Sequence, residues 1–177
     1  MVTPSRSPAR NRPTRPPTPP LPPFEMLDRT HHRVLEVLKQ FDRLLEHVDE
    51  NGPDAVARAS AAEIVEFFAG HARQHHADEE LHVFPPLLRS TDANLVQQVQ
   101  RLQQDHGWLE EDWRELSPQI EAIAQGYNWY DLAMLRQALP VFSALYEEHI
   151  ALEESLIYPE AKRQQATLAA GAQARSS

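Results

Sequence analysis

The sequence contains no cysteine and no long apolar run. Without cysteine in 177 residues, disulfides, thiolate metal sites and iron–sulfur clusters are excluded, so any metal site must use nitrogen and oxygen ligands. No apolar run approaches the roughly 20 residues needed to cross a bilayer. The N-terminus also lacks the apolar core of a secretory signal. We therefore expect a cytoplasmic protein that does not bind membranes.

Charge and proline are unevenly distributed along the chain. Residues 1–23 carry four arginines and no acid, so with a net charge of −9 the remainder carries −13. An acidic domain repels phosphate backbones, so we expect no binding to nucleic acid. The same 23 residues hold nine of the fifteen prolines, and such a segment is expected to be a disordered tail. The folded domain is expected over residues 24–160, followed by a frayed tail over 161–177.

An eleven-residue pattern made of metal-ligand residues occurs twice. Residues 75–85 read His-x3-Glu-Glu-x3-Phe-Pro, and residues 149–159 read His-x3-Glu-Glu-x3-Tyr-Pro. A histidine and a glutamate four residues apart lie on one face of a helix, one turn from each other. Both side chains can then reach the same metal. Two such pairs indicate a site for two metal ions between facing helices.

Two further histidines extend the repeat. His31 lies 44 residues before His75, and His106 lies 43 residues before His149. Each half of the chain is then a helix with a lone histidine followed by a helix with His-x3-Glu. Two copies of such a helical hairpin predict an all-α, up-down four-helix bundle.

Apolar residues at helical spacing and turn residues between them place the helices. Four are expected, over about residues 23–49, 54–85, 92–118 and 129–158. Asp54 is expected to cap the second helix, and Ser90-Thr91-Asp92 to cap the third. Pro85-Pro86 and Pro118 are expected to end or kink their helices, and Pro140 to kink the fourth.

Six side chains of metal-ligand type fall on the inward faces of these helices: His31, His75, Glu79, His106, His149 and Glu153. A buried carboxylate without a partner costs several kcal/mol, and a pair of cations between the helices would satisfy all six groups. The alternative is that the helical phase differs and the six lie at the surface. Other metal patterns fit less well, because ferritin-like sites use Glu-x-x-His and zinc proteases use His-Glu-x-x-His. A zinc pair of His71 and His75 would leave the second repeat unexplained.

The other polar residues near the motifs have less defined roles. His71 and His82 share the inward face of the second helix. They are expected to be core residues whose ring nitrogens are hydrogen-bonded, or else to orient or join the metal ligands. Residues that fall off the inward faces are expected at the surface, and these are His32, His47, His76, Glu80 and Glu154. For the two glutamates, contact with the edge of the metal site is the alternative.

These residues resemble a known family, the hemerythrin-like or HHE cation-binding domains. The resemblance rests on the two His…Glu-Glu stretches with their Phe-Pro and Tyr-Pro ends and on Asp105-His106, and it covers about Phe24 to Glu160. Hemerythrins are four-helix bundles that hold a non-heme di-iron centre with oxo or carboxylate bridges. The resemblance implies two Fe ions bridged by Glu79 and Glu153. The other implied ligands are, for one iron, His31 and His75, and for the second iron, His106 and His149.

The chain departs from the oxygen-carrying hemerythrins on two helices. Those proteins have His-x3-His on the third helix and His-x4-Asp on the fourth, whereas this chain has His106-x3-Glu110 and His149-x3-Glu153. The second metal therefore lacks one histidine unless Glu110 or a water replaces it. The pattern resembles a subgroup linked to iron or oxygen sensing and to the handling of nitric oxide or peroxide.

The function expected from this resemblance is binding or sensing of O2, NO, peroxide or iron rather than catalysis. A di-iron enzyme with peroxidase or nitric oxide-metabolising activity is the alternative, and iron buffering is a third possibility. Manganese and zinc also accept nitrogen and oxygen ligands, so the residues alone leave the metal open. They also leave open the oligomeric state and any protein partner.

Overall fold

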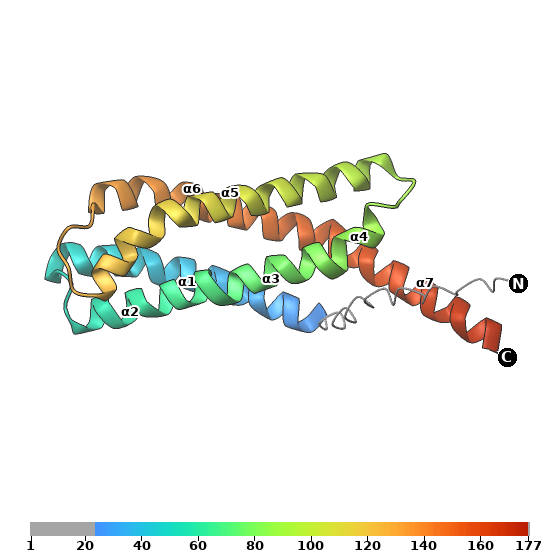
Figure 1. The fold of residues 1–177 in the computed structure, drawn as a ribbon, viewed down its shortest axis with the longest axis horizontal. Coiled ribbons are helices and arrows are strands. Elements are labelled where there is room, and N and C mark those ends of the chain that lie inside the picture. The colour runs from blue at the N-terminus through green and yellow to red at the C-terminus, as the bar shows by residue number, and fades with distance from the viewer. Residues whose placement is uncertain (1–23, 177) are drawn as a thin grey trace, which may run out of the picture.

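Helices account for nearly all of the part of the chain that the structure describes. The computed structural model describes residues 24–176, so the N-terminal segment expected to be disordered lies outside the described residues. No strand occurs in residues 24–176, and the helices form four long antiparallel rods (Figure 1). The predicted all-α four-helix bundle is confirmed. The first rod is α1 (Phe24–Asn51), and the third is α5 (Ala93–Ala124). The second rod consists of α2 (Ala55–Glu66), the π-helical turn η1 (Phe67–Ala72), α3 (Arg73–Asp78), the π-helical turn η2 (Glu79–Val83) and α4 (Phe84–Leu87). The fourth rod consists of α6 (Leu132–Leu152), the π-helical turn η3 (Glu153–Ile157) and α7 (Tyr158–Ser176).

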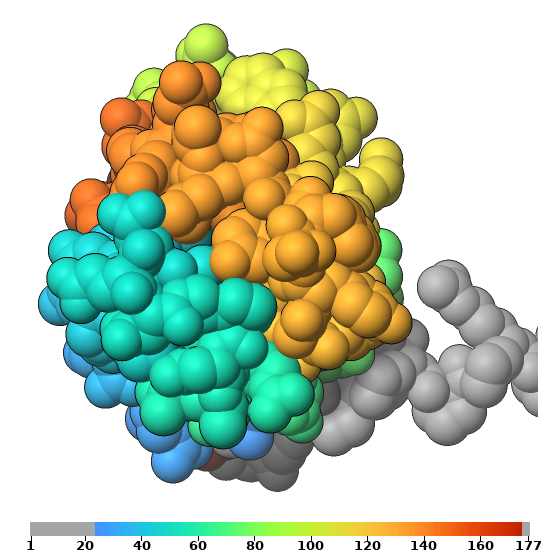
Figure 2. Space-filling model, turned by 90° about the vertical axis from the view of Figure 1, so that its left-hand side faces the viewer, coloured from blue at the N-terminus to red at the C-terminus, as the bar shows by residue number. Residues whose placement is uncertain are grey.

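Each rod has two neighbours in the bundle. α1 packs against α2 and α6, and α5 packs against the same two helices. The four rods therefore surround one interior, which every helix reaches with one face. At one end of the bundle the α1–α2 turn and the α5–α6 connection cover the interior (Figure 2).

Aspartates cap three of the helices. The Asp54 side chain accepts a hydrogen bond from the Ala57 N–H at 2.8 Å, and Asp92 accepts from the N–H groups at the start of α5. These two caps are as predicted. α6 begins at Leu132 rather than Trp129, because the Asp131 carboxylate caps it by accepting a hydrogen bond from the Met134 N–H at 2.9 Å.

The prolines expected to end or kink helices lie within or at the start of helical segments. After Pro85-Pro86 the helix ends at Leu87, whereas α5 continues past Pro118 to Ala124. Pro85 and Pro86 lie in the first turn of α4, and Pro159 lies in the first turn of α7. A first-turn proline lacks only an N–H that has no partner in its own helix, so the chain continues in helical form. Pro118 lies within α5, between the buried Leu116 and Ile120, and the burial of these neighbours outweighs the loss of one backbone hydrogen bond.

The C-terminal helix also differs from expectation. The chain was expected to fray after residue 160, whereas α7 continues to Ser176 and extends beyond the bundle (Figure 1). Its sequence is rich in alanine, glutamine and arginine, which have high helix propensity. No helix in residues 24–176 is long and apolar enough to cross a membrane.

A polar layer divides the bundle interior into two apolar clusters. The larger cluster contains Val34, Ala72, Leu109 and Tyr146, and the smaller one contains Leu27, Val83, Leu102 and Ile157. Along the sequence of every rod, the predicted ligands lie between a residue of the larger cluster and a residue of the smaller cluster. The four rods therefore carry these ligands at the same level of the bundle.

Candidate metal centre

A wide helical turn begins at each inward glutamate of the repeated motif. η2 starts at Glu79 and η3 at Glu153, and the carbonyl of each accepts the N–H five residues later, from Phe84 and Tyr158 respectively. The next residue is a proline, which has no N–H for the carbonyl four positions before it, so the regular ladder is already interrupted there. Such π-helical turns are frequent at functional sites, and here they carry the two inward carboxylates.

The structure brings all six predicted ligands together, and each is at most 8% exposed. Their nitrogen and oxygen atoms form two groups, and within each group the atoms lie within 4.8 Å of one another. His31 and His75 make up the first group with both glutamates, and His106 and His149 make up the second with the same two glutamates. Glu79 and Glu153 are therefore shared, as bridging carboxylates must be.

The first group combines side chains from three rods. His31 Nε2 lies 3.1 Å from Glu153 Oε2. His75 Nε2 lies 3.5 Å from Glu79 Oε1. The two imidazole rings meet edge to face with their centroids 4.8 Å apart. Nitrogen and carboxylate oxygen atoms from α1, α3, η2 and η3 thus converge on one point.

The second group converges in the same way from the other side of the glutamates. His106 Nε2 lies 3.4 Å from Glu79 Oε2 and 4.0 Å from Glu153 Oε1. His149 Nε2 lies 3.2 Å from Glu153 Oε1 and 3.2 Å from His106 Nε2. Each glutamate therefore faces histidines of both groups.

Unpartnered buried atoms mark the centre as a place for cations. Both ring nitrogens of His75, Oε2 of Glu79 and both carboxylate oxygens of Glu153 are buried and make no hydrogen bond. No lysine or arginine of residues 24–176 pairs with either glutamate, whose ionic neighbours are all histidines. A buried carboxylate without compensation is strongly destabilising. The layer therefore fits a pair of cations that accept nitrogen and oxygen ligands.

The pKa shifts within the layer also favour cations at this place. Burial, together with the adjacent charge of Glu79, raises the pKa of Glu153 to about 8. Burial lowers the pKa of His75 to about 4, so its imidazole is neutral and has a free lone pair. Although burial opposes it, the neighbouring glutamates raise the pKa of His31 and of His106. Cations between the carboxylates would displace these protons.

The second glutamate of each motif also contacts the centre, which was the alternative to a purely exposed position; Glu154 is exposed as expected, and Glu80 is half-buried. Oε1 of Glu154 lies 3.0 Å from Nδ1 of His31, and Oε1 of Glu80 lies 3.1 Å from Nδ1 of His106. Each carboxylate is partly exposed, yet it accepts a hydrogen bond from the lone histidine of the other half. That bond holds the Nδ1 proton and turns Nε2, with its lone pair, toward the centre. The doubled Glu-Glu of the motif was the available signal.

Tyr158 is a further residue of the centre that was not among the predicted site residues. Its hydroxyl donates a hydrogen bond to Oε1 of Glu79 and lies 3.2 Å from Nε2 of His31. Its ring stacks on the His31 ring, with centroids 5.3 Å apart. At the equivalent position of the first motif, Phe84 stacks on His106 at 5.5 Å without a hydroxyl. The Phe-Pro and Tyr-Pro ends of the motifs were the signal for these two stacks.

The other residues considered as additional ligands lie outside the two groups. His71 is exposed and stacks on Phe67, and His82 is half-buried and belongs to neither group. Glu110 pairs with Arg73, so it is held away from the second group. Asp105 is buried beside the second group, with Oδ2 3.8 Å from Nδ1 of His149, which is longer than a hydrogen bond.

His76 is a different case, because its expected exposure is wrong. Its side chain is half-buried, its Nε2 is buried without a hydrogen-bond partner, and its ring stacks on His106. Burial, then the neighbouring His106, lowers the pKa of His76 well below its usual range. The other two histidines expected at the surface lie outside the centre. His32 is exposed, and His47 pairs with Asp54 at 2.9 Å.

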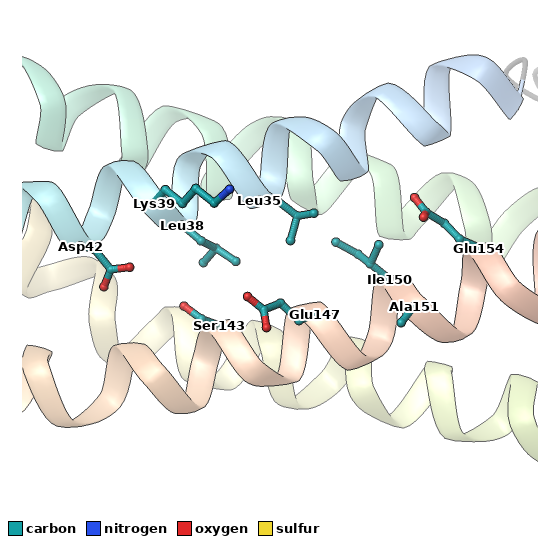
Figure 3. Close-up of a pocket in the computed structure, with 9 residues that line it drawn as sticks. All are labelled: Leu35, Leu38, Lys39, Asp42, Ser143, Glu147, Ile150, Ala151 and Glu154. Carbon is teal, nitrogen blue, oxygen red and sulfur yellow. The ribbon is translucent and has the colours of Figure 1, made fainter.

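A pocket of about 360 Å³ lies between α1 and α6 (Figure 3). Leu35, Leu38 and Ile150 line its apolar part. Glu154 lies at one end of the pocket, and the same carboxylate binds His31. The pocket therefore extends from the surface to a side chain that contacts the first group.

Comparison with known proteins covers this same part of the chain. The family model of the hemerythrin HHE cation-binding domain matches residues 23–161, which include all six side chains of the centre. An uncharacterized protein of Haemophilus influenzae is 30% identical over 133 residues, which are 75% of this chain and 74% of that protein.

Proposed function

The chain belongs to the hemerythrin HHE cation-binding family, and from this membership we propose that it holds two iron ions at Glu79 and Glu153 and uses them to bind a small diatomic molecule or a peroxide. The observation that carries the proposal is the pair of fully buried carboxylates, each placed between histidines of two groups. Nothing in an apolar interior favours such a layer unless cations compensate it.

The ligand set follows from the two groups. His31 and His75 would hold one ion, His106 and His149 the other, and the two glutamates would bridge them. Imidazole and carboxylate donors suit iron. When bound, iron supplies a redox-active centre with coordination positions that a small molecule can occupy.

The other residues of the centre prepare the ligands. Glu154 and Glu80 orient the imidazoles of His31 and His106 through Nδ1. The Tyr158 hydroxyl fixes one oxygen of Glu79. The two apolar clusters exclude bulk water from both ends of the layer. A layer fixed in this way holds its donors in place before any ion arrives, which lowers the cost of binding.

Binding or sensing is favoured over bulk storage, because the buried donors suffice for two ions. A second candidate is turnover of peroxide or nitric oxide by the same centre. The pocket between α1 and α6 favours it, because a route from the surface would let substrate and product exchange.

Metal analysis with an optical spectrum tests the first proposal. After expression in iron-replete medium, we expect two irons per chain and the near-ultraviolet absorption of a bridged ferric pair. Fewer than about one iron per chain would contradict it. The candidates then separate in assays on the loaded protein. Steady consumption of hydrogen peroxide or nitric oxide supports the enzyme, whereas a saturable spectral change without turnover supports binding or sensing.

A further inference from the structure

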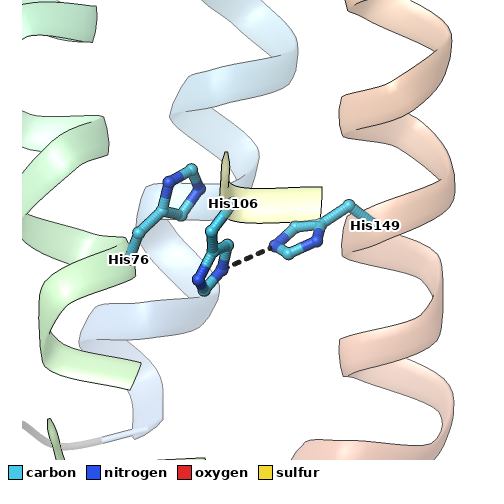
Figure 4. A group of neighbouring side chains, drawn as sticks. All are labelled: His76, His106 and His149. Atoms are coloured by element: carbon cyan, nitrogen blue, oxygen red, sulfur yellow. Dashed lines mark hydrogen bonds between the residues drawn. The ribbon is translucent and has the colours of Figure 1, made fainter. Parts of the chain in front are cut away.

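His76 occupies a place in the centre that neither bridged group uses. It directly follows His75 on α3, so its side chain faces α5 and α6 rather than α1. Its ring is stacked on His106, with centroids 4.1 Å apart and an interplanar angle of 17°. It meets the His149 ring nearly edge-on at 5.5 Å (Figure 4).

The nitrogens of the three histidines form a group of their own. One ring nitrogen from each of His76, His106 and His149 lies within 4.8 Å of the others. In Figure 4 the three side chains come from three rods and point toward one another. Nε2 of His76 is buried and has no hydrogen-bond partner. Among residues 24–176, the imidazoles with such a nitrogen are those of His75, His149 and His76, and the first two are already ligand candidates.

The internal repeat shows that packing alone does not require a histidine here. Residue 150 of the second motif corresponds to residue 76 of the first, and it is Ile150. Ile150 is 5% exposed and belongs to the larger apolar cluster. An apolar side chain therefore fills the equivalent place, whereas at residue 76 the bundle contains a nitrogen whose burial without a partner is unfavourable.

We propose that His76 is a third histidine ligand of the second metal ion, alongside His106 and His149. The inference rests on the proposed two-metal function and makes the two positions unequal. The three-histidine group shares His106 and His149 with the second bridged group. In this assignment the second ion would have three histidines and the two shared glutamates, and the first ion two histidines and the same glutamates. The first position, beside Tyr158 and the pocket that ends at Glu154, is then the one with fewer protein ligands.

Two substitutions at residue 76 separate a ligand from a packing residue. His76→Ile reproduces the residue that the repeat itself places at this position, and His76→Phe keeps a ring that can stack on His106 but has no nitrogen. His71→Ile is the matched control, because His71 lies on the same rod, is exposed and belongs to none of the groups. Circular dichroism of the metal-free proteins establishes that each variant is helical.

The metal-free proteins are titrated with ferrous iron under anaerobic conditions, by calorimetry and by metal content after desalting. We expect two ions in the wild type and in His71→Ile. In both residue-76 variants we expect one ion to bind as in the wild type and the other to bind at least about tenfold more weakly. If one of the two residue-76 variants does not fold, the iron titration of the other variant tests the inference.

Each outcome has a distinct meaning. If both ions bind the residue-76 variants with wild-type affinity, His76 is a packing residue and the inference is overturned. If the wild type itself holds fewer than two ions, the proposed two-metal function fails, and this inference fails with it.

Discussion

The hydroxyl of Tyr158 donates a hydrogen bond to Oε1 of Glu79, so a residue of the second motif holds the buried carboxylate of the first, which both groups share. The reciprocal contact does not form, because the first motif has Phe84 where the second has Tyr158. Two chemically similar halves therefore produce a centre with a hydroxyl on one side only.

Tyr158→Phe should lower the free energy of unfolding of the metal-free protein by about 1–3 kcal/mol, because an oxygen of buried Glu79 then loses its donor. The loss should be smaller in the loaded protein, where a cation compensates the same oxygen. Urea unfolding with and without iron measures both values. Tyr127→Phe is the control, since Tyr127 is 50% exposed. Equal stability of the wild type and Tyr158→Phe in both states would contradict this role.

Glu154→Gln and Glu80→Gln should weaken different ions. Each carboxylate orients one lone histidine through Nδ1, and loss of such a partner costs about 10- to 100-fold in metal affinity. Glu154→Gln should affect the ion at His31, and Glu80→Gln the ion at His106. Stepwise iron titration by calorimetry reports the two affinities.

The control for this pair is Glu148→Gln. Glu148 is 69% exposed and pairs with Arg101 at the surface, and such pairs contribute little. A similar weakening in Glu148→Gln would mean that net charge, rather than orientation of the histidines, sets the affinity.

Glu79→Ala should weaken both ions by more than about 100-fold, because the residue belongs to both groups and loss of a ligand exceeds loss of a supporting partner. His32→Ala should leave iron content unchanged, since His32 is exposed and its ring bonds only the Asp28 carbonyl. Iron per chain after purification measures both. Loss of iron in His32→Ala together with retention in Glu79→Ala would place the metals elsewhere.

Iron affinity should rise with pH up to about 8. The pKa of Glu153 is raised to about 8 by burial and by Glu79, and the pKa values of His31 and His106 are raised by their glutamate neighbours against the effect of burial. Glu153 holds a proton at neutral pH that a cation must displace, and the raised pKa values of the two histidines favour their protonated forms. Affinity therefore increases by about tenfold per pH unit for each proton released. It should level off above the pKa of Glu153.

Calorimetry at pH 7 in two buffers of different ionisation enthalpy counts the released protons. The number should fall at pH 9. His75 should contribute none, because burial lowers its pKa to about 4 and it is already neutral. Identical heats in the two buffers at pH 7 would show that the ligands are unprotonated before the metal binds.

The sequence was sufficient to predict the bundle and the level of the centre, because a repeat of His and His-x3-Glu fixes both spacing and helical phase. Residues on one inward face, such as His31 and Glu79, can be found in this way. Glu80 and Glu154 could be named only as residues that reach the edge of the site. Their partners could not be predicted, because each glutamate bonds a histidine of a neighbouring helix whose position is known only after packing.

His76 was misplaced for a related reason. A single apolar stripe predicts the buried residues of a helix that packs against one other helix. α3 lies in a bundle in which each rod packs chiefly against two others. A residue next to the stripe then faces a second helix instead of solvent. Pro118 does not end α5, which continues to Ala124. At Pro85-Pro86 the helix ends one residue later, at Leu87, after a π-helical turn and a first-turn position that both accommodate proline.

The polar layer between the two apolar clusters also determines how cooperatively the bundle unfolds. Each end of the bundle has an apolar cluster of its own, and the six ligands lie between them on every rod. Cations that bind all four rods at this level join the two ends into one unfolding unit. After chelation the layer becomes hydrated, and the end that contains Leu102 should open before the end that contains Leu109. Amide hydrogen exchange of the loaded protein should show one common slow rate, and that of the chelated protein should show two. The metal would then define the unit that folds as well as the chemistry that follows.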